Sequence, residues 1–138
     1  MDAKFPAKPG TYILLLKLET ATSISIGALG TFDFPAGWYA YVGSAFGPGG
    51  LRGRLAHHLR PVRRPHWHID YLRQAASVQH VVFKAGTELR EHVWAAQLAA
   101  LPGAWMPVPR FGASDCRCPA HLVGYRSEAR PDPLAILG

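Results

Sequence analysis

The segment TYILLLKL at residues 11–18 contains an unbroken run of five apolar residues, from Tyr12 to Leu16, and no apolar run in the chain is longer. A run of this length is typical of a buried β-strand, because a membrane-spanning helix needs about 20 consecutive apolar residues. The polar N-terminus is not followed by a signal-like apolar region. We therefore expect a cytoplasmic protein with this strand in its core, and a chain of 138 residues suits a single domain.

Strand and helix patterns follow one another along the rest of the chain. Alternating, β-branched and aromatic residues predict strands near residues 23–29, 32–34, 38–42, 78–83 and 121–126. Leu51, Leu55 and Leu59 recur every four residues, which predicts a helix over 51–59 with these side chains in the core. Further helices are expected at residues 66–75 and from Thr87, as N-cap, to about Leu101.

These elements indicate an α+β fold, in which a small antiparallel or mixed β-sheet is flanked by helices. The strands from residue 11 to residue 42 are expected to form an antiparallel meander. We place the domain at residues 10–126, after a loose lead-in at 1–9 and before a C-terminal tail at 127–138.

Positive charge is concentrated in one part of the chain. The formal net charge is +6, and six arginines and four histidines lie within residues 52–73, where Asp70 is the only acid. A solvated basic face would account for this, but guanidinium groups grip phosphate through paired hydrogen bonds. We therefore expect a nucleic-acid partner, with phosphate contacts from Arg52, Arg60, Arg63, Arg64 and His66.

Two short motifs lie at the ends of predicted strands. Gly10-Thr11-Tyr12 opens the first strand, and Tyr41-Val42-Gly43 closes the aromatic strand before a glycine-rich loop that begins at Ser44. Arg54 and His58 follow on the next helix, four residues apart and so on one helix face. If the first strand pairs with the aromatic strand, both tyrosines point to the same face of the sheet.

These blocks together resemble the GIY-YIG nuclease superfamily. The segments PHWHIDYL (65–72) and FGASDCRCPAHL (111–122) resemble a branch catalogued as a domain of unknown function, sometimes fused to endonuclease III. The resemblance runs from about Gly10 to Tyr125. It implies a small antiparallel sheet carrying a phosphodiesterase site with one divalent metal ion, acting on DNA, for instance in repair.

The resemblance also implies roles for individual residues. Tyr12 and Tyr41 would position or deprotonate the attacking water, Arg54 would stabilise charge on the phosphate, and His58 would assist proton transfer. Gly43 would let the scissile phosphate approach, with Ser44 beside it. Either His66 or His68 would take the place of a second site histidine, with His68 preferred. Glu91, with Glu88 as second choice, would hold Mg²⁺ or a similar cation such as Mn²⁺, which prefer oxygen ligands.

The chain also departs from the familiar pattern. The tyrosine motifs are usually about ten residues apart, whereas residues 13–40 separate them here, and the loop before Arg54 is longer. An asparagine is expected after Pro109-Arg110-Phe111, but the chain contains none. Ser114 and Asp115 are the candidates to take its place. A non-catalytic nucleic-acid-binding module is therefore a second reading.

A third reading is a metal-binding or partner-docking domain centred on residues 115–121. Cys116, Cys118 and His121 lie within DCRCPAH, but no second pair of ligands with zinc-site spacing is evident, so zinc is not expected. Without the family resemblance, Tyr12 and Tyr41 would be read as core aromatics and Asp70 as a favourable charge in the first turn of a helix. Oligomeric state is left open.

Overall fold

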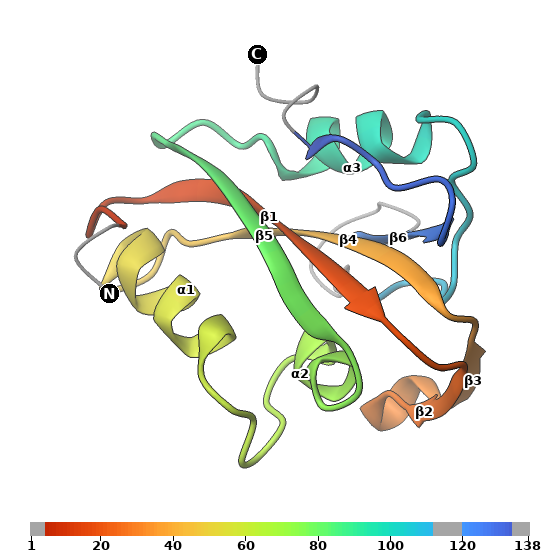
Figure 1. The fold of residues 1–138 in the computed structure, drawn as a ribbon. Helices are drawn as coiled ribbons and strands as arrows, with labels where there is room; N and C mark the ends of the chain where they lie inside the picture. Colours follow the sequence, from red (N-terminus) through yellow and green to blue (C-terminus); the bar gives the residue numbers. More distant parts are fainter. Residues whose placement is uncertain (1–4, 112–119, 134–138) are drawn as a thin grey trace.

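The computed structural model describes residues 5–111 and 120–133, and its centre is a four-stranded antiparallel sheet in the order β5-β1-β4-β6 (Figure 1). These strands are β1 (Gly10–Leu18), β4 (Gly37–Ser44), β5 (Ser77–Ala85) and β6 (Leu122–Arg126). A separate two-stranded sheet pairs β2 (Thr22–Ser25) with β3 (Thr31–Phe34), and a 3₁₀ turn (Gly27–Leu29) joins them.

Helices cover both faces of the central sheet. α1 (Gly50–Leu59) and α2 (His68–Arg73) share one hydrophobic core with Tyr12, Leu14 and the β2–β3 hairpin. α3 (Glu91–Ala99) packs on the opposite face, where Trp94 and Leu98 meet Ile13 and Leu15. Successive side chains of β1 point in turn into one core and then the other. Both faces of the strand are therefore buried, as its apolar run predicted.

The α+β fold class is confirmed, but the predicted meander is wrong. β1 pairs directly with β4, so that Tyr12 lies opposite Gly43 and Leu14 opposite Tyr41. The hairpin between them leaves the central sheet and covers one of its faces. Sequence alternation shows that β2 and β3 are strands, but it does not show which strand each one pairs with.

The core stripe of α1 also differs from the prediction. Leu51 and Leu55 are buried, but Leu59 is 47% exposed, and His58 is buried in its place at 1% exposure. A spacing of four residues drifts around a helix that has 3.6 residues per turn, so the spacing of seven from Leu51 to His58 returns more closely to the core face.

The other two helices are shorter than predicted. α2 begins at His68, and α3 begins at Glu91 with Arg90 at its N-cap, so Thr87 does not cap it. Helix boundaries depend on tertiary packing as well as on local signals. None of the helices in residues 5–111 and 120–133 is long and apolar enough to cross a membrane.

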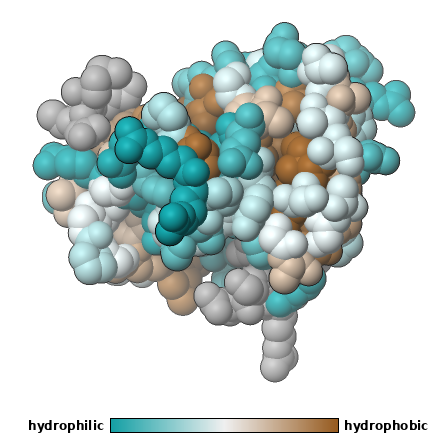
Figure 2. Space-filling view, turned by 90° about the horizontal axis from the view of Figure 1, so that it is seen from below, coloured by the Kyte–Doolittle hydropathy of each residue, from teal (hydrophilic) through white to brown (hydrophobic). Residues whose placement is uncertain are grey.

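The segment before β1 is packed against α1. Phe5 is 4% exposed, and the carbonyls of Pro6 and Lys8 accept hydrogen bonds from the backbone of Arg52 and Leu51. Residues 5–9 thus satisfy N–H groups at the start of α1 that have no partner inside the helix. The side of the molecule that carries α1, α2 and the loop between them has a strongly hydrophilic patch (Figure 2).

Candidate functional site

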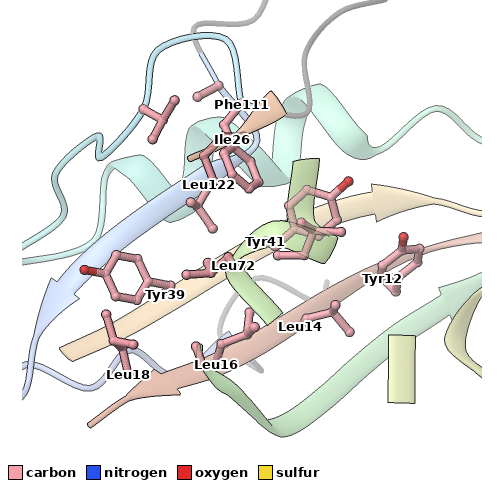
Figure 3. Packing of buried hydrophobic residues seen from close by; sticks show 14 of the residues in the cluster. Tyr12, Leu14, Leu16, Leu18, Ile26, Tyr39, Tyr41, Leu72, Phe111 and Leu122 are labelled. Atoms are coloured by element: carbon pink, nitrogen blue, oxygen red, sulfur yellow. The ribbon is translucent and has the colours of Figure 1, made fainter. Parts of the chain in front are cut away.

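Tyr12 and Tyr41 lie on neighbouring strands and point to the same face of the sheet, as the alternation predicted (Figure 3). Their ring centroids are 6.4 Å apart, and both side chains are buried. Burial raises the pKa of each phenol, and the Arg54 guanidinium opposes this effect at both. Both tyrosines therefore carry their protons at neutral pH.

Gly43 leaves the space that the Tyr12 ring occupies. A Cβ atom built on Gly43 would collide with the hydroxyl and ring of Tyr12, its partner across the β1–β4 ladder. The sequence suggested that a glycine here lets a phosphate approach. In the structure the neighbouring phenol is sufficient reason for a glycine at this position.

His58 is the hydrogen-bonding partner of Tyr12. Its Nε2 lies 2.7 Å from the Tyr12 hydroxyl, and its Nδ1 is buried without a hydrogen-bond partner among the described residues. Burial lowers the pKa of His58 to about 3, and the nearby Arg73 and His57 act in the same direction. At neutral pH the imidazole is therefore uncharged, and its Nε2 can accept the phenolic proton.

His58 should make stability depend on pH in a defined direction. Its folded-state pKa of about 3 lies below the ordinary value of 6.5, so the unfolded chain takes up this proton first as the pH falls. Its contribution is complete above pH 6.5 and is lost at about 1.4 kcal/mol per pH unit as the pH falls toward 3. Between pH 7 and about pH 4.5, we expect His58→Gln to lose roughly 2–3 kcal/mol less unfolding free energy than the parent in urea titrations. Equal losses in the two proteins would contradict this assignment.

Ser44, the last residue of β4, connects Arg54 with Glu91. Arg54 Nη1 donates to the Ser44 carbonyl at 3.0 Å, and the Ser44 hydroxyl donates to Glu91 Oε2 at 2.9 Å. Glu88, the second-choice metal ligand, is exposed and instead forms a 3.0 Å ion pair with Arg90. The structure thus places Glu91, and not Glu88, beside the other candidate residues.

Glu91 reaches this place from the opposite side of the sheet. α3 packs on the face away from the tyrosines, but Glu91 is its first residue and lies at the end of β4. From there its charge still raises the pKa of Tyr12 and Tyr41, after the larger effect of burial. The carboxylate and the phenols therefore belong to one electrostatic environment at the end of the sheet.

His121 and His68 also lie near the candidate centre, by which we mean Tyr12, Tyr41, Arg54, His58 and Glu91. His121, considered above as a zinc ligand, is buried, and its Nδ1 is 3.8 Å from Glu91 Oε1. The His68 ring packs 5.6 Å from Phe111, which in turn lies 6.0 Å from Tyr41. The Phe111 ring therefore lies between His68 and the tyrosine pair. Ser114, Asp115, Cys116 and Cys118 lie outside the described residues.

Asp70 organises the other side of the centre. The carboxylate accepts hydrogen bonds from the backbone N–H groups of His66 and Trp67 at 2.8 and 3.0 Å, and His57 Nε2 is 3.2 Å away. Burial opposes ionisation of Asp70, but these hydrogen bonds bring its pKa below the ordinary value. The sequence predicted no role for His57, although its position beside His58 and the lone acid in a basic segment could have indicated this pair.

Two groups of residues offer ligands to a metal ion. The donor atoms of His57, His58 and Asp70 lie within 4.8 Å of one another. Arg73 lies 3.8 Å from Asp70, however, and hydrogen bonds already explain the position of that carboxylate. The Glu91 carboxylate and Ser44 hydroxyl offer oxygen atoms, which suit Mg²⁺ or Mn²⁺. Glu91 therefore fits the predicted cation better.

The predicted phosphate-binding residues lie on the side of the protein that carries α1. Arg52 is exposed, and its Nε donates to the Phe5 carbonyl. Residues 60–64, His57 and Arg73 line a hollow of about 580 Å³. Trp67 lies between this hollow and the candidate centre. The Arg54 guanidinium is 4.4 Å from the Trp67 ring centroid, and the ring centroids of His57 and Trp67 are 4.7 Å apart. His66 is exposed.

Comparison with known proteins gives a family but no activity. We found no curated protein and no solved structure with a significant match to the chain. One family matches over residues 11–135, which include all the residues of the centre described above. The chain therefore belongs to the family described as Domain of unknown function DUF123.

Proposed function

We propose that this protein is a divalent-metal-dependent endonuclease that hydrolyses phosphodiester bonds in DNA by a GIY-YIG-type mechanism, in the cytoplasm. The supporting observation is the convergence of Tyr12, Arg54, His58 and Glu91 at one end of the sheet, through the Tyr12–His58 and Arg54–Ser44–Glu91 hydrogen bonds. These groups come from β1, α1 and α3, and a phosphodiester hydrolase needs such groups around one phosphate.

In the proposed reaction a water oxygen bonds to phosphorus while the phosphorus–oxygen bond to the leaving nucleoside breaks. The water must lose a proton, and the Tyr12 hydroxyl can receive it as its own proton passes to His58 Nε2, 2.7 Å away. The transfer is costly in the resting protein, because the raised pKa of Tyr12 makes its phenol a poor proton donor and the lowered pKa of His58 makes its imidazole a poor acceptor. An anionic phosphate bound nearby would raise the pKa of His58 and make this transfer easier.

Arg54 and Glu91 supply the charges that the reaction needs. The Arg54 guanidinium, supported by the Ser44 carbonyl and the Trp67 ring, would stabilise negative charge on the phosphate oxygens. Glu91 would hold a Mg²⁺ or Mn²⁺ ion, which would supply positive charge to balance the negative charge of the reacting phosphodiester. The Ser44 hydrogen bond orients the Glu91 carboxylate for this role.

A non-catalytic nucleic-acid-binding module is the second candidate function. It is favoured by the near-complete burial of Tyr12 and Tyr41, which suits core aromatics, and by the absence of asparagine from the chain. This reading keeps the basic surface and predicts DNA binding without cleavage.

Nicking of supercoiled plasmid with Mg²⁺ separates the two functions. We expect the parent to nick and Glu91→Gln to be slower by about tenfold to a hundredfold, because the uncharged amide is a weaker ligand for a hard cation. Glu88→Gln is the matched control, since it removes the same charge three residues away on the protein surface. Glu88→Gln should nick at the parent rate, and chelation of the metal ion by EDTA should stop nicking by the parent and by Glu88→Gln.

Other results would exclude parts of the proposal. A purified parent that binds DNA but does not nick it with Mg²⁺ or Mn²⁺ would favour the non-catalytic module. If Glu91→Gln and Glu88→Gln nick equally fast, Glu91 does not hold the metal ion.

A further inference from the structure

The hollow beside α1 has a strongly positive lining. Four arginines and His57 surround it, and none of the described lining residues is acidic. Asp70 pairs with Arg73 at 3.8 Å, so one of these positive charges is partly neutralised. Arg60, Arg63 and Arg64 are exposed and can meet an anionic ligand.

The walls of the hollow are held in position by the fold. Arg73 donates to the carbonyls of His57 and Arg60 at the end of α1. Arg60 Nε donates to the carbonyl of Ala56. Pro61 and Pro65 flank Arg63 and Arg64 in the sequence, and their rings restrict the backbone at both ends of this segment. The side of the hollow formed by Arg60 and Arg73 is therefore preformed.

The size and lining of the hollow suit more than a single phosphate. Its volume of about 580 Å³ lies within the range of about 300–1,000 Å³ that is typical of small-molecule sites. Pro61 and Val62 contribute apolar surface between the arginines. A phosphate could meet the guanidinium groups while its sugar or base contacts these two residues.

The hollow is joined to the candidate centre through aromatic rings. His57 lines the hollow, and its ring centroid is 5.5 Å from that of His58 and 4.7 Å from that of Trp67. The Arg54 guanidinium lies over the Trp67 ring, 4.4 Å from its centroid. Arg54 is therefore separated from the hollow by only two side chains, those of Trp67 and His57.

We propose that this hollow is a nucleotide subsite, which binds one nucleotide of the DNA strand at a position beyond the scissile phosphate. Arg63 and Arg64 bind its phosphate, and Pro61 and Val62 contact its sugar or base. The identity of the ligand as part of a substrate strand rests on the proposed nuclease function. The binding itself requires neither the metal ion nor Glu91.

Binding of a fluorescein-labelled DNA duplex in EDTA, followed by anisotropy at several salt concentrations, tests the subsite without cleavage. We expect the double variant Arg63→Gln/Arg64→Gln to bind roughly tenfold more weakly and to reduce the salt slope by about 1–2. Arg126→Gln/Arg130→Gln is the matched control. It removes two exposed arginines that lie in and after β6, which pairs with the end of β4 remote from Ser44. This control should bind nearly as the parent does.

Competition experiments identify the ligand of the hollow. A deoxynucleoside monophosphate should displace the duplex from the parent at lower concentration than inorganic phosphate does, and this difference should disappear in Arg63→Gln/Arg64→Gln. Equal displacement by the two competitors would overturn the nucleotide subsite, as would equal affinities of the two double variants. If the binding results are as expected but no plasmid is nicked, the subsite stands and the nuclease function fails.

Discussion

Replacing Arg54 with alanine is expected to lower the rate of plasmid nicking by about 10²–10³-fold, by analogy with the loss of one preorganised donor to a charged transition state. Arg54 is the half-buried cation beside Tyr12, and its guanidinium is held by the Ser44 carbonyl and the Trp67 ring. Single-turnover nicking with excess enzyme measures this effect, because product release does not then limit the rate.

Two further variants distinguish catalysis from stability. Arg54→Lys keeps the positive charge, but an ammonium group cannot form the paired hydrogen bonds of a guanidinium to a phosphate or stack on the Trp67 ring. Its nicking rate should therefore lie between those of the parent and of Arg54→Ala. Arg126→Ala removes an exposed arginine at the remote end of β4 and should nick normally. If Arg54→Ala nicks at the parent rate, Arg54 does not stabilise charge on the phosphate.

Gly43→Ala is expected to destabilise the protein by about 1–3 kcal/mol, as overpacking does in a close-packed core. The new methyl group would meet the hydroxyl and ring of Tyr12, which is buried and hydrogen-bonded to His58. Displacement of Tyr12 should also disturb the Tyr12–His58 hydrogen bond and slow nicking. Urea unfolding of the variant and its parent measures the first effect, and the plasmid assay measures the second.

Gly47→Ala is the matched control for this substitution. A Cβ atom on Gly47 meets no atom within 4 Å, so stability should change little. The double variant Gly43→Ala/Tyr12→Ala should lose less stability than the sum of its two single variants, because without the ring there is no collision. Strict additivity would show that Gly43 is needed for another reason.

The sequence predicted the parts of the site that depend on local periodicity. Period-two alternation placed Tyr12 and Tyr41 on one face once their strands paired. The i, i+4 spacing placed Arg54 near His58, and both side chains contact Trp67. The continuous apolar run identified β1 as a buried strand, and the structure covers both of its faces. These relations hold within one element or between two paired strands, so single-sequence patterns can reveal them.

Relations between distant elements were harder to predict. His121 meets Glu91 because β6 pairs with β4 and α3 begins beside the end of β4. The contact of His57 with Asp70 likewise depends on how α1 packs beside α2. Periodicity does not determine such long-range packing, whereas the burial of His58 in place of Leu59 follows from the 3.6-residue repeat of the helix.

The position of β1 has a consequence for how the site can adapt to a ligand. β1 lies between β4 and β5 with both faces covered, so Tyr12 cannot shift without breaking strand pairing on two sides. α1, which carries Arg54 and His58, begins at Gly50 with Gly49 as its N-cap, and the φ angles of these two glycines, 57° and 86°, are left-handed. The helix is nevertheless tied to the strand, because Leu51 and Leu55 are buried against the same core and His58 is hydrogen-bonded to Tyr12, so an incoming DNA strand would meet the phenol and Arg54 as one preformed unit.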